Sequence, residues 1–288
     1  MTLGEKWTVD ELLRLASDTA VEAGQLLLDR LGSDSRPIQT NPIHTNPIHT
    51  KAGAGDVVTA ADHESESLIV RRLLAARPDD GVIAEERGAS PGGSGLTWII
   101  DPLDGSANYV HGAPPFAVSI AACDAVEGRR LSPLVGALFD PVHREIFRAA
   151  RGRGATLNGA ALRRRPARPL AGALVGTGLA HTQALRLAQL SVLGRLIPQV
   201  GDLRRSGAGA VDLCWVAAGR IDAFYQPGLK IWDFAAAQLV VTESGARFAL
   251  ASGLEGSTET VVATAPELEL DFIAALEASG VRPIASGR

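Results

Sequence analysis

The segment Trp98–Tyr109 reads WIIDPLDGSANY, and it indicates both a buried strand and a metal site. Its apolar, β-branched start predicts a strand over residues 96–100 that ends at Asp101. A second carboxylate follows at Asp104, with the carbonyl of Leu103 between the two. Carboxylate and carbonyl oxygens are hard ligands that suit Mg²⁺ when they converge on one point. The segment therefore predicts a magnesium site at the end of the strand.

The residues after the second carboxylate favour a phosphate site beside that metal. Gly105 allows close approach of the backbone to a ligand, and Ser106 can begin a helix. Such a helix would direct free N–H groups and the positive end of its dipole toward an anion. An ordinary Asx turn is the alternative interpretation of this segment taken alone, because Asp-Pro and Asp-Gly are common turn dipeptides.

Three further acidic segments weigh against the turn interpretation. DVVTAAD at 56–62 opens a predicted helix, IAEE at 83–86 ends a predicted strand, and IWDFAAAQLVVTESG at 231–245 begins another helix. A single Asp such as Asp62 or Asp233 is more often a helix-start residue favoured by the dipole. Two unit charges about 4 Å apart repel by about 4 kcal/mol at an effective dielectric of about 20, so gathered carboxylates would need divalent cations to stay together.

The order of these segments resembles the inositol monophosphatase family. The matching patterns are DxVTxxD, EE, WxIDPLDGSxNY and WDxAAxxLxVxESG, and they extend from Lys51 to Phe248. Two more family motifs lie between them, AxRGxGAxxNG at 149–159 and DLCxVAxGxxDAF at 212–224. The resemblance implies an α+β fold, built as a layered αβαβα sandwich, and usually a homodimer.

The same resemblance implies a magnesium-dependent, lithium-sensitive phosphatase that uses two or three Mg²⁺ ions. Its expected substrate is a small phosphorylated alcohol, with myo-inositol 1-phosphate first. Sister activities on histidinol phosphate, fructose 1,6-bisphosphate or adenosine 3′,5′-bisphosphate are alternatives. A non-enzymatic role as an RNA-polymerase or ribosome-assembly partner is another, with Arg163–Arg168 or Arg204-Arg205 as contacts. The complete set of carboxylates favours the enzyme.

The resemblance also assigns roles to individual residues by position. The implied metal ligands are Glu85, Asp101, the Leu103 carbonyl, Asp104 and Asp233. The implied catalytic residues are Glu85, Ser106 and Asp62, the last at a weaker, outer metal position. The implied phosphate and substrate contacts are Lys51, Asp104, Gly105, Ser106, Gly209, Gln226 and Asp233.

Three positions depart from the family pattern. Ser106 stands for the usual Thr and keeps its hydroxyl, and Tyr109 stands for the usual Phe. Gln226, in YQPGLKIWD, stands where inositol phosphatases usually carry a Glu that contacts a substrate hydroxyl. Gln226 therefore calls the inositol specificity into question. The alternative is that its side chain points to solvent and has no such role.

Composition limits the class of protein. The chain has 288 residues, of which 46% are hydrophobic, and a net charge of −4. This charge gives no basis for coating nucleic acid or an anionic membrane. The start of the chain has no apolar signal core and no apolar run reaches membrane-span length, so a soluble, cytoplasmic protein is expected. Cys123 and Cys214 lie in apolar stretches, so we expect two buried free thiols.

Hydrophobic periodicity and turn residues predict the following elements. Helices are expected at 9–31, 61–76, 182–196, 208–218 and 232–244, the first with a capping box of Thr8 and Glu11 and an end at Gly32. Strands are expected at 81–84, 96–100, 116–123, 134–139 and 145–150, with a hairpin turn at Asn158-Gly159.

Two loops and one domain boundary complete the prediction. A repeated NPIHT makes 41–50 a loop, whose His44 and His49 are more often surface residues than metal ligands, and GASPGGSG makes 88–95 another. The basic residues within 163–168 are expected in a solvated turn. A boundary near residue 155 would separate an α+β domain (1–155) with most metal ligands from an α/β domain (156–288) with Asp233 and the substrate contacts.

Overall fold

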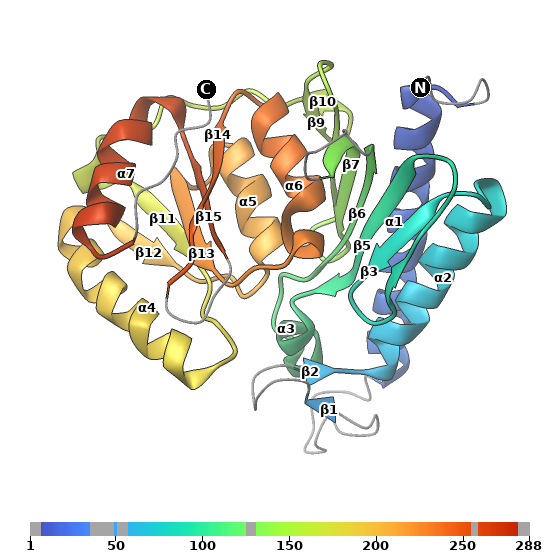
Figure 1. Ribbon diagram of the computed structural model, residues 1–288. Coiled ribbons are helices and arrows are strands. Elements are labelled where there is room, and N and C mark those ends of the chain that lie inside the picture. The colour runs from blue at the N-terminus through green and yellow to red at the C-terminus, as the bar shows by residue number, and fades with distance from the viewer. Residues whose placement is uncertain (1–6, 35–48, 51–56, 125–130, 255–258, 282–288) are drawn as a thin grey trace.

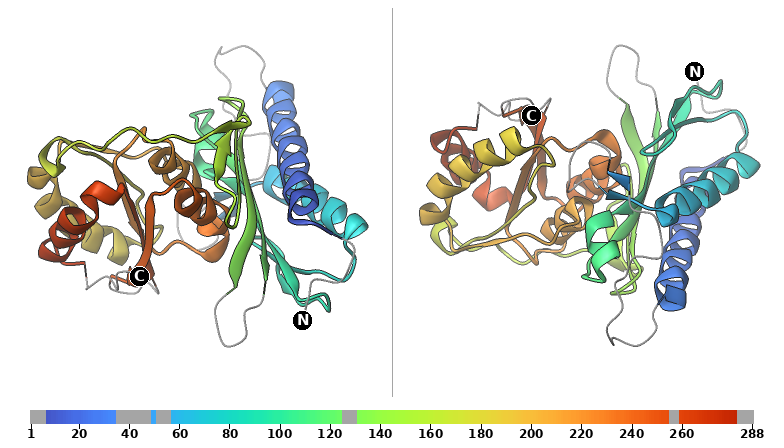
Figure 2. Two further views of the ribbon diagram at one scale, coloured as in Figure 1. Left: turned by 90° about the horizontal axis from the view of Figure 1, so that it is seen from above. Right: turned by 90° about the horizontal axis from the view of Figure 1, so that it is seen from below.

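The computed structural model describes residues 7–34, 49–50, 57–124, 131–254 and 259–281. Its helices and sheets stack in alternating layers (Figures 1 and 2). Helices α1 (Val9–Asp34) and α2 (Ala60–Ala76) cover one face of an eight-stranded sheet, and α5 (Gly209–Ala217) and α6 (Ile231–Glu243) cover its other face. A five-stranded sheet follows, with α4 (Gln183–Leu196) and α7 (Glu269–Ala278) on the outside. This arrangement confirms the αβαβα sandwich.

The first sheet has the strand order β10-β9-β8-β7-β6-β5-β3-β4. Strands β3 and β5 pair in parallel, and the other neighbours pair antiparallel. The strands are β3 (Gly81–Ala84), β4 (Gly88–Ser90), β5 (Leu96–Asp104), β6 (Ala117–Asp124), β7 (Ser132–Asp140), β8 (Glu145–Ala150), β9 (Ala155–Leu157) and β10 (Ala160–Ala161).

The second sheet has the strand order β12-β11-β13-β15-β14. Its first three strands run parallel to one another, and β15 pairs antiparallel with both β13 and β14. The strands are β11 (Leu174–Thr177), β12 (Asp202–Arg204), β13 (Ala223–Pro227), β14 (Arg247–Ser252) and β15 (Glu259–Thr264). None of these strands, nor α7, is among the elements predicted from the sequence.

Helix α1 begins where the sequence predicts. The N–H of Thr8 donates to Glu11 Oε2 at 2.7 Å, and the N–H of Glu11 donates to Thr8 Oγ1 at 3.2 Å, which completes the capping box. The predicted end at Gly32 is wrong, because the helix continues to Asp34. One Gly within a helix costs about 1 kcal/mol relative to Ala, and this helix offsets that cost by packing on the sheet. Its fully buried apolar residues are Leu12, Ala16, Ala20, Ala23 and Leu27.

Strand β5 positions the acidic segment. It does not stop at Asp101 as predicted but continues to Asp104, and its pairing with β6 shifts register between these two residues. Such an irregularity re-aims side chains that a regular pleat would send to opposite faces. The short helix α3 (Ser106–His111) follows directly, as Ser106 predicts.

Short strands replace parts of both predicted loops. Strand β4 lies within 88–95 and pairs with β3, while β1 (His49–Thr50) pairs with β2 (Val57–Val58). Strands of two or three residues are too short to show a period in the sequence. Residues 41–48, and therefore His44, lie outside the described residues.

The basic segment after β10 is exposed at Arg163, Arg165 and Arg168, as predicted, whereas Arg164 is partly buried. The Arg164 side chain is 8% exposed and its Nη2 lies 3.1 Å from Glu267 Oε2, and Arg165 Nη2 donates to the Gly219 carbonyl at 3.0 Å. Both contacts are to residues far along the chain, which local sequence cannot reveal. The segment links the two sheets, between Ala161 and Leu174. The domain boundary at residue 155 stays a prediction.

Other local predictions are confirmed. Asn158 and Gly159 both have positive φ, 50° and 83°, and they connect β9 to β10 as a tight hairpin. Cys123 and Cys214 are buried free thiols. None of the helices in the described part of the chain has the length and apolarity needed to cross a bilayer.

Candidate functional site

A cleft of about 130 Å³ opens where the end of β5 faces the second half of the chain. One wall comes from the β3 and β5 ends and α3, and the other from the segments after β11 and β12, the end of β13 and the starts of α5 and α6. The residues that line the cleft include Glu85, Asp101, Leu103, Asp104, Gly105, Ser106, Gly178, His181, Arg186, Arg205, Gly209, Asp212, Gln226 and Asp233.

Five carboxylates line this cleft, and four of them belong to the acidic segments identified in the sequence. Glu85 follows β3, Asp101 and Asp104 lie on β5, and Asp233 lies in the first turn of α6. Burial, followed by repulsion from Glu85, Asp104 and Asp233, raises the pKa of Asp101 well above its usual value. Burial, followed by repulsion from Glu85, likewise raises the pKa of Asp233. The protein thus gathers acidic groups at a cost in free energy.

Asp104 connects the two halves of the molecule. Its Oδ2 accepts a hydrogen bond from the N–H of Ala210 at 2.9 Å, at the start of α5. Burial raises the pKa of Asp104 to about 7, although hydrogen bonds from the α5 backbone act in the opposite direction. The carboxylate therefore spans the cleft from the first sheet to a helix that packs on the second.

Asp233 is held by its own helix start. Its Oδ2 accepts a hydrogen bond from the N–H of Lys230, the N-cap residue of α6, at 2.6 Å. This bond satisfies one backbone donor that the helix cannot pair internally. The helix-start interpretation of Asp233 is therefore correct, and the same carboxylate also lines the cleft.

Ser106 forms hydrogen bonds behind the cleft. Its Oγ lies 2.8 Å from Asp62 Oδ1 and 3.0 Å from the Leu103 carbonyl oxygen. Asp62 is 1% exposed, does not line the cleft, and accepts through Oδ2 from the N–H and Oγ1 of Thr59 at 2.8 and 2.6 Å. The described geometry therefore connects Asp62 to the cleft through Ser106.

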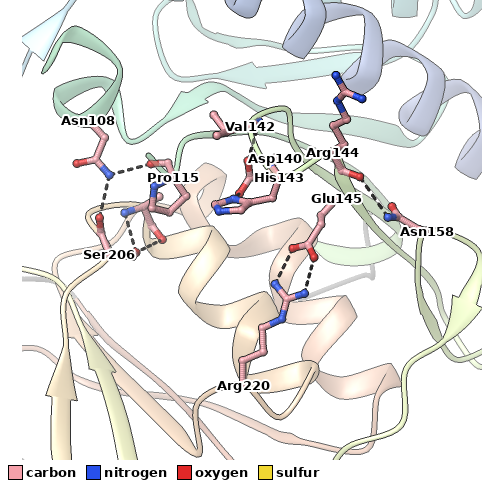
Figure 3. Close-up of polar contacts among 11 residues, drawn as sticks. Asn108, Pro115, Asp140, Val142, His143, Arg144, Glu145, Asn158, Ser206 and Arg220 are labelled. Atoms are coloured by element: carbon pink, nitrogen blue, oxygen red, sulfur yellow. Dashed lines mark hydrogen bonds and ion pairs between the residues drawn. The ribbon is translucent and has the colours of Figure 1, made fainter. Parts of the chain in front are cut away.

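Backbone geometry brings the Gly105 turn against the opposite wall. Gly105 has a φ of +89°, and a Cβ there would lie 3.3 Å from the Ala208 Cβ on the opposite wall. Asn108 on α3 donates through Nδ2 to the carbonyls of Pro115 and Ser206, each at 2.8 Å (Figure 3). A Cβ on Gly207 would lie 2.6 Å from Asn108 Oδ1, so glycine is required at that position too.

Tyr109 also makes more than a packing contact. Its hydroxyl donates to the Leu27 carbonyl on α1 at 3.1 Å, and its ring meets the Phe116 ring edge-on at 5.1 Å. A Phe at this position would lose the hydrogen bond. Tyr109, which departs from the family pattern, therefore connects α3 to α1 through this hydrogen bond.

Gln226 lies at the end of β13 and lines the cleft. Its side chain covers Gly178, where a Cβ would lie 2.0 Å from Gln226 Oε1, and it approaches Gly209, where the same distance would be 3.4 Å. The alternative that Gln226 simply points to solvent is therefore wrong. Lys51, another predicted substrate contact, lies outside the described residues.

Several cleft residues had no place in our sequence-based site. His181, Arg186, Arg205 and Asp212 line it, although none of them is among the site residues expected from the sequence. Burial raises the pKa of Asp212 to about 7. Its position in the DLCxVAxGxxDAF motif, and its helical spacing from Gly209, could have indicated it.

The donor set fits Mg²⁺ in chemistry. All of the cleft's carboxylate and carbonyl donors are hard oxygens, and a divalent cation would relieve the repulsion that raises their pKa values. Within the ranges that the structure describes, no three His, Cys, Asp or Glu side chains are already gathered as a metal centre. The carboxylates share the walls of one cleft.

Comparisons with known proteins identify the family of this chain. The family model described as "Inositol monophosphatase family" matches residues 8–280. A relative named inositol-1-monophosphatase, from Mycobacterium bovis, is 39% identical over 246 residues, which is 81% of this chain and 83% of that protein. A relative named Nus factor SuhB, from Pasteurella multocida, is 44% identical over 192 residues, 66% of this chain and 70% of that protein.

A solved structure supports the same conclusion at the level of the fold. The crystal structure of the extragenic suppressor protein suhB from Bartonella henselae has a TM-score of 0.81 and 31% sequence identity, and the match covers 92% of this chain and 98% of that chain. Together with the family match over almost the whole sequence, this similarity shows that the chain belongs to the inositol monophosphatase family, whose phosphatases are generally metal-dependent.

Proposed function

We propose that the protein is a magnesium-dependent phosphomonoesterase of small phosphorylated alcohols, with myo-inositol 1-phosphate as the first substrate to test. The observation that carries this proposal is the cleft in which Glu85, Asp101, Asp104 and Asp233 accompany the Gly105 turn. Carboxylates can hold divalent cations, and the turn can offer backbone N–H groups to phosphate. The family match supports phosphatase chemistry.

Two groups of ligands would hold two ions, and a third ion would bind more weakly near Asp62. Glu85, Asp101 and the Leu103 carbonyl form the first group, and Asp101, Asp104 and Asp233 form the second. When bound, the ions supply Lewis-acid chemistry and neutralise charge on the phosphate. Asp101 belongs to both groups, so its loss should affect the whole site.

The reaction would be hydrolysis in one displacement. Water adds to phosphorus, the P–O bond to the alcohol breaks, and the alcohol leaves with a proton. Glu85 would accept a proton from the attacking water, and Ser106 Oγ would orient that water. The Ser106 hydroxyl can donate its hydrogen bond to Asp62 or to the Leu103 carbonyl. A lone pair on Oγ is then available to accept a hydrogen bond from water.

The other wall would contact the leaving alcohol. Asp104 Oδ2 accepts from Ala210 N–H, and the same carboxylate would also contact a cation or a substrate hydroxyl. Gly209 would let the substrate approach the start of α5, and Gln226 would accept from another hydroxyl. A neutral acceptor is worth about 0.5–1.5 kcal/mol and a charged one about 1.5–3. Gln226 should therefore bind inositol less tightly than Glu would.

The resemblance supports further parts of this proposal. Lys51 would contact the phosphate, lithium would inhibit, and the protein would act in the cytoplasm as a homodimer. The sister phosphatase activities would use the same metal and phosphate site and would differ in the substrate contacts on the opposite wall of the cleft.

A second candidate function rests on the relative named Nus factor SuhB, at 44% identity. A comparable role here, as an RNA-polymerase or ribosome-assembly partner, would not need the carboxylates. Asp101→Asn would then abolish phosphate release and leave that role intact, which separates the two functions.

The direct test is release of inorganic phosphate from a panel of phosphomonoesters, with and without Mg²⁺. The panel contains inositol 1-phosphate, histidinol phosphate, fructose 1,6-bisphosphate, adenosine 3′,5′-bisphosphate and β-glycerophosphate. We expect turnover of at least one ester in Mg²⁺ and loss of turnover in EDTA. Equal rates with EDTA, or no turnover of any ester, would refute the proposal.

A further inference from the structure

Three parallel strands of the second sheet deliver polar side chains to the cleft at their carboxyl ends. Arg205 directly follows β12, His181 and Arg186 follow β11, and Gln226 lies near the end of β13 (Figure 1). In open parallel sheets, ligands bind beyond the carboxyl ends of the strands. This wall is therefore a natural place for the part of a substrate that is not the reacting phosphate.

The two walls of the cleft differ in charge. Glu85, Asp101 and Asp104 make the first wall acidic, whereas the second wall carries Arg186 and Arg205 in addition to Asp212 and Asp233. If the reacting phosphate lies at the carboxylates, as the proposed function requires, the rest of the substrate lies against the arginines. A neutral polyol has no need of such a wall.

The turn after β11 is held rigidly in place. Gln189 on α4 is fully buried, donates through Nε2 to the Gly178 carbonyl at 2.6 Å and accepts through Oε1 from the N–H of Ala180 at 2.7 Å. Arg186 donates through Nε to the Ala180 carbonyl at 2.6 Å. That bond uses one of five guanidinium N–H donors and fixes the orientation of the group.

Arg205 is positioned by a different contact. Asp212, which is 1% exposed and also lines the cleft, attracts the Arg205 guanidinium electrostatically. Asp212 offsets part of the positive charge of this wall. Among the residues that the structure describes, no carboxylate forms an ion pair with Arg186, and its Nε donates to a backbone carbonyl.

We propose that this arginine wall, Arg186 and Arg205, binds a second anionic group, so that the preferred substrates are phosphorylated alcohols that carry a further phosphate or carboxylate. The inference rests on the proposed function and names its substrate class. Arginine suits such a group because its planar fork pairs with two oxygens of a phosphate or carboxylate. The bond broken is still the ester P–O bond to the alcohol.

The test compares kcat/KM for matched pairs of esters in Mg²⁺. One pair is fructose 1,6-bisphosphate and fructose 1-phosphate, which differ by a second phosphate. The other pair is 2-phosphoglycerate and glycerol 2-phosphate, which differ by a carboxylate. We expect the wild-type protein to prefer the ester with the second anion by about tenfold or more in at least one pair, and the pair that responds identifies the anion.

Two variants and a control locate the preference. Arg186→Gln and Arg205→Gln should each reduce the preference ratio several-fold, mainly through KM, and Arg205→Lys should retain part of it. The control is Arg204→Gln, because Arg204 is adjacent, does not line the cleft and pairs with Asp202 at 2.5 Å. That variant should keep the wild-type ratio.

Three outcomes would overturn the inference. The wild-type ratio could be near one in both pairs, or Arg204→Gln could lower it as much as the cleft variants do. The cleft variants could also slow both members of a pair equally, which would mean that the arginines hold the reacting phosphate. In each case the esters are still hydrolysed and the proposed function stands. Absence of turnover for every ester would instead refute the proposed function, and this inference with it.

Discussion

Glu66 on α2 accepts a hydrogen bond from the backbone N–H of Glu86 at 2.8 Å, and this bond fixes the turn that carries Glu85. The Glu66 side chain is fully buried, and its Oε1 lies 3.2 Å from Arg87 Nε. The preceding residue, Ser65, donates through Oγ to the Pro102 carbonyl at 2.8 Å. Two neighbouring residues of α2 therefore hold both acidic segments of the cleft.

Glu66→Ala should loosen that turn. It leaves a buried N–H without its acceptor, so we expect the free energy of unfolding to fall by about 1–3 kcal/mol. The Mg²⁺ concentration for half-maximal activity should rise as well, because Glu85 loses its support. Urea unfolding and a magnesium titration measure the two effects.

The matched control for Glu66 is Glu64→Ala on the same helix. Glu64 pairs with Arg30 at 2.5 Å, but both side chains are about half exposed, at 40% and 52%. Such pairs contribute less than about 1 kcal/mol. If both variants behave alike, Glu66 has no positioning role.

Two substitutions of Asp104 should separate its contribution to stability from its contribution to catalysis. Asp104→Asn keeps an oxygen that can accept from Ala210 N–H, whereas Asp104→Ala removes it. In metal-free buffer the free energy of unfolding of Asp104→Asn should therefore exceed that of Asp104→Ala by about 0.5–1.5 kcal/mol. Both variants should lose nearly all phosphatase activity, because both lose the charge. A fully active Asn variant would show that the Asp104 charge is not needed for catalysis.

We expect Ser106 to contribute to catalysis through its hydroxyl group alone. Ser106→Ala should lower kcat by about 10–100-fold, in line with loss of a group that orients the attacking water. Ser106→Thr keeps the oxygen and should stay within a few-fold of the wild-type protein. Steady-state kinetics with the best ester of the panel measures this, and equal loss in both variants would point to packing instead.

Gln226→Glu should restore a charged acceptor for a substrate hydroxyl. The gain of about 1–1.5 kcal/mol corresponds to about tenfold in kcat/KM on inositol 1-phosphate. Histidinol phosphate and β-glycerophosphate, assayed beside it, should not share that gain. Equal changes on all three esters, or none, would show that Gln226 does not contact the hydroxyls of inositol.

Local chemistry made much of the fold predictable. The Thr8–Glu11 capping box and the Asn158-Gly159 turn depend on neighbours within three residues, and both form as expected. The end of α1 was wrong because packing on the sheet outweighs one glycine. The bulge between Asp101 and Asp104 was not predictable, since it arises from pairing with β6.

The site depends on contacts that sequence spacing does not contain. Asp104 meets Ala210, 106 residues later, and Asp62 meets Ser106, 44 residues later. Sequence patterns identified the acidic residues. Only the family resemblance, and not their spacing, placed Asp233 in the same predicted site. Arg186 and Arg205 carried no such pattern and became visible only in the folded cleft.

Asp101→Asn tests the central claim of a carboxylate site built for magnesium. Asn keeps the oxygen that accepts from Leu103 N–H, a 3.0 Å bond in the wild-type protein. It removes a charge that repels Glu85, Asp104 and Asp233, so the metal-free variant should be at least as stable as the wild-type protein.

The decisive measurement is the thermal midpoint Tm with and without Mg²⁺, in parallel with phosphate release. We predict that Mg²⁺ raises the Tm of the wild-type protein and supports turnover, and that it does neither in Asp101→Asn. A variant that matches the wild-type protein in magnesium-induced Tm shift and in turnover would contradict the account.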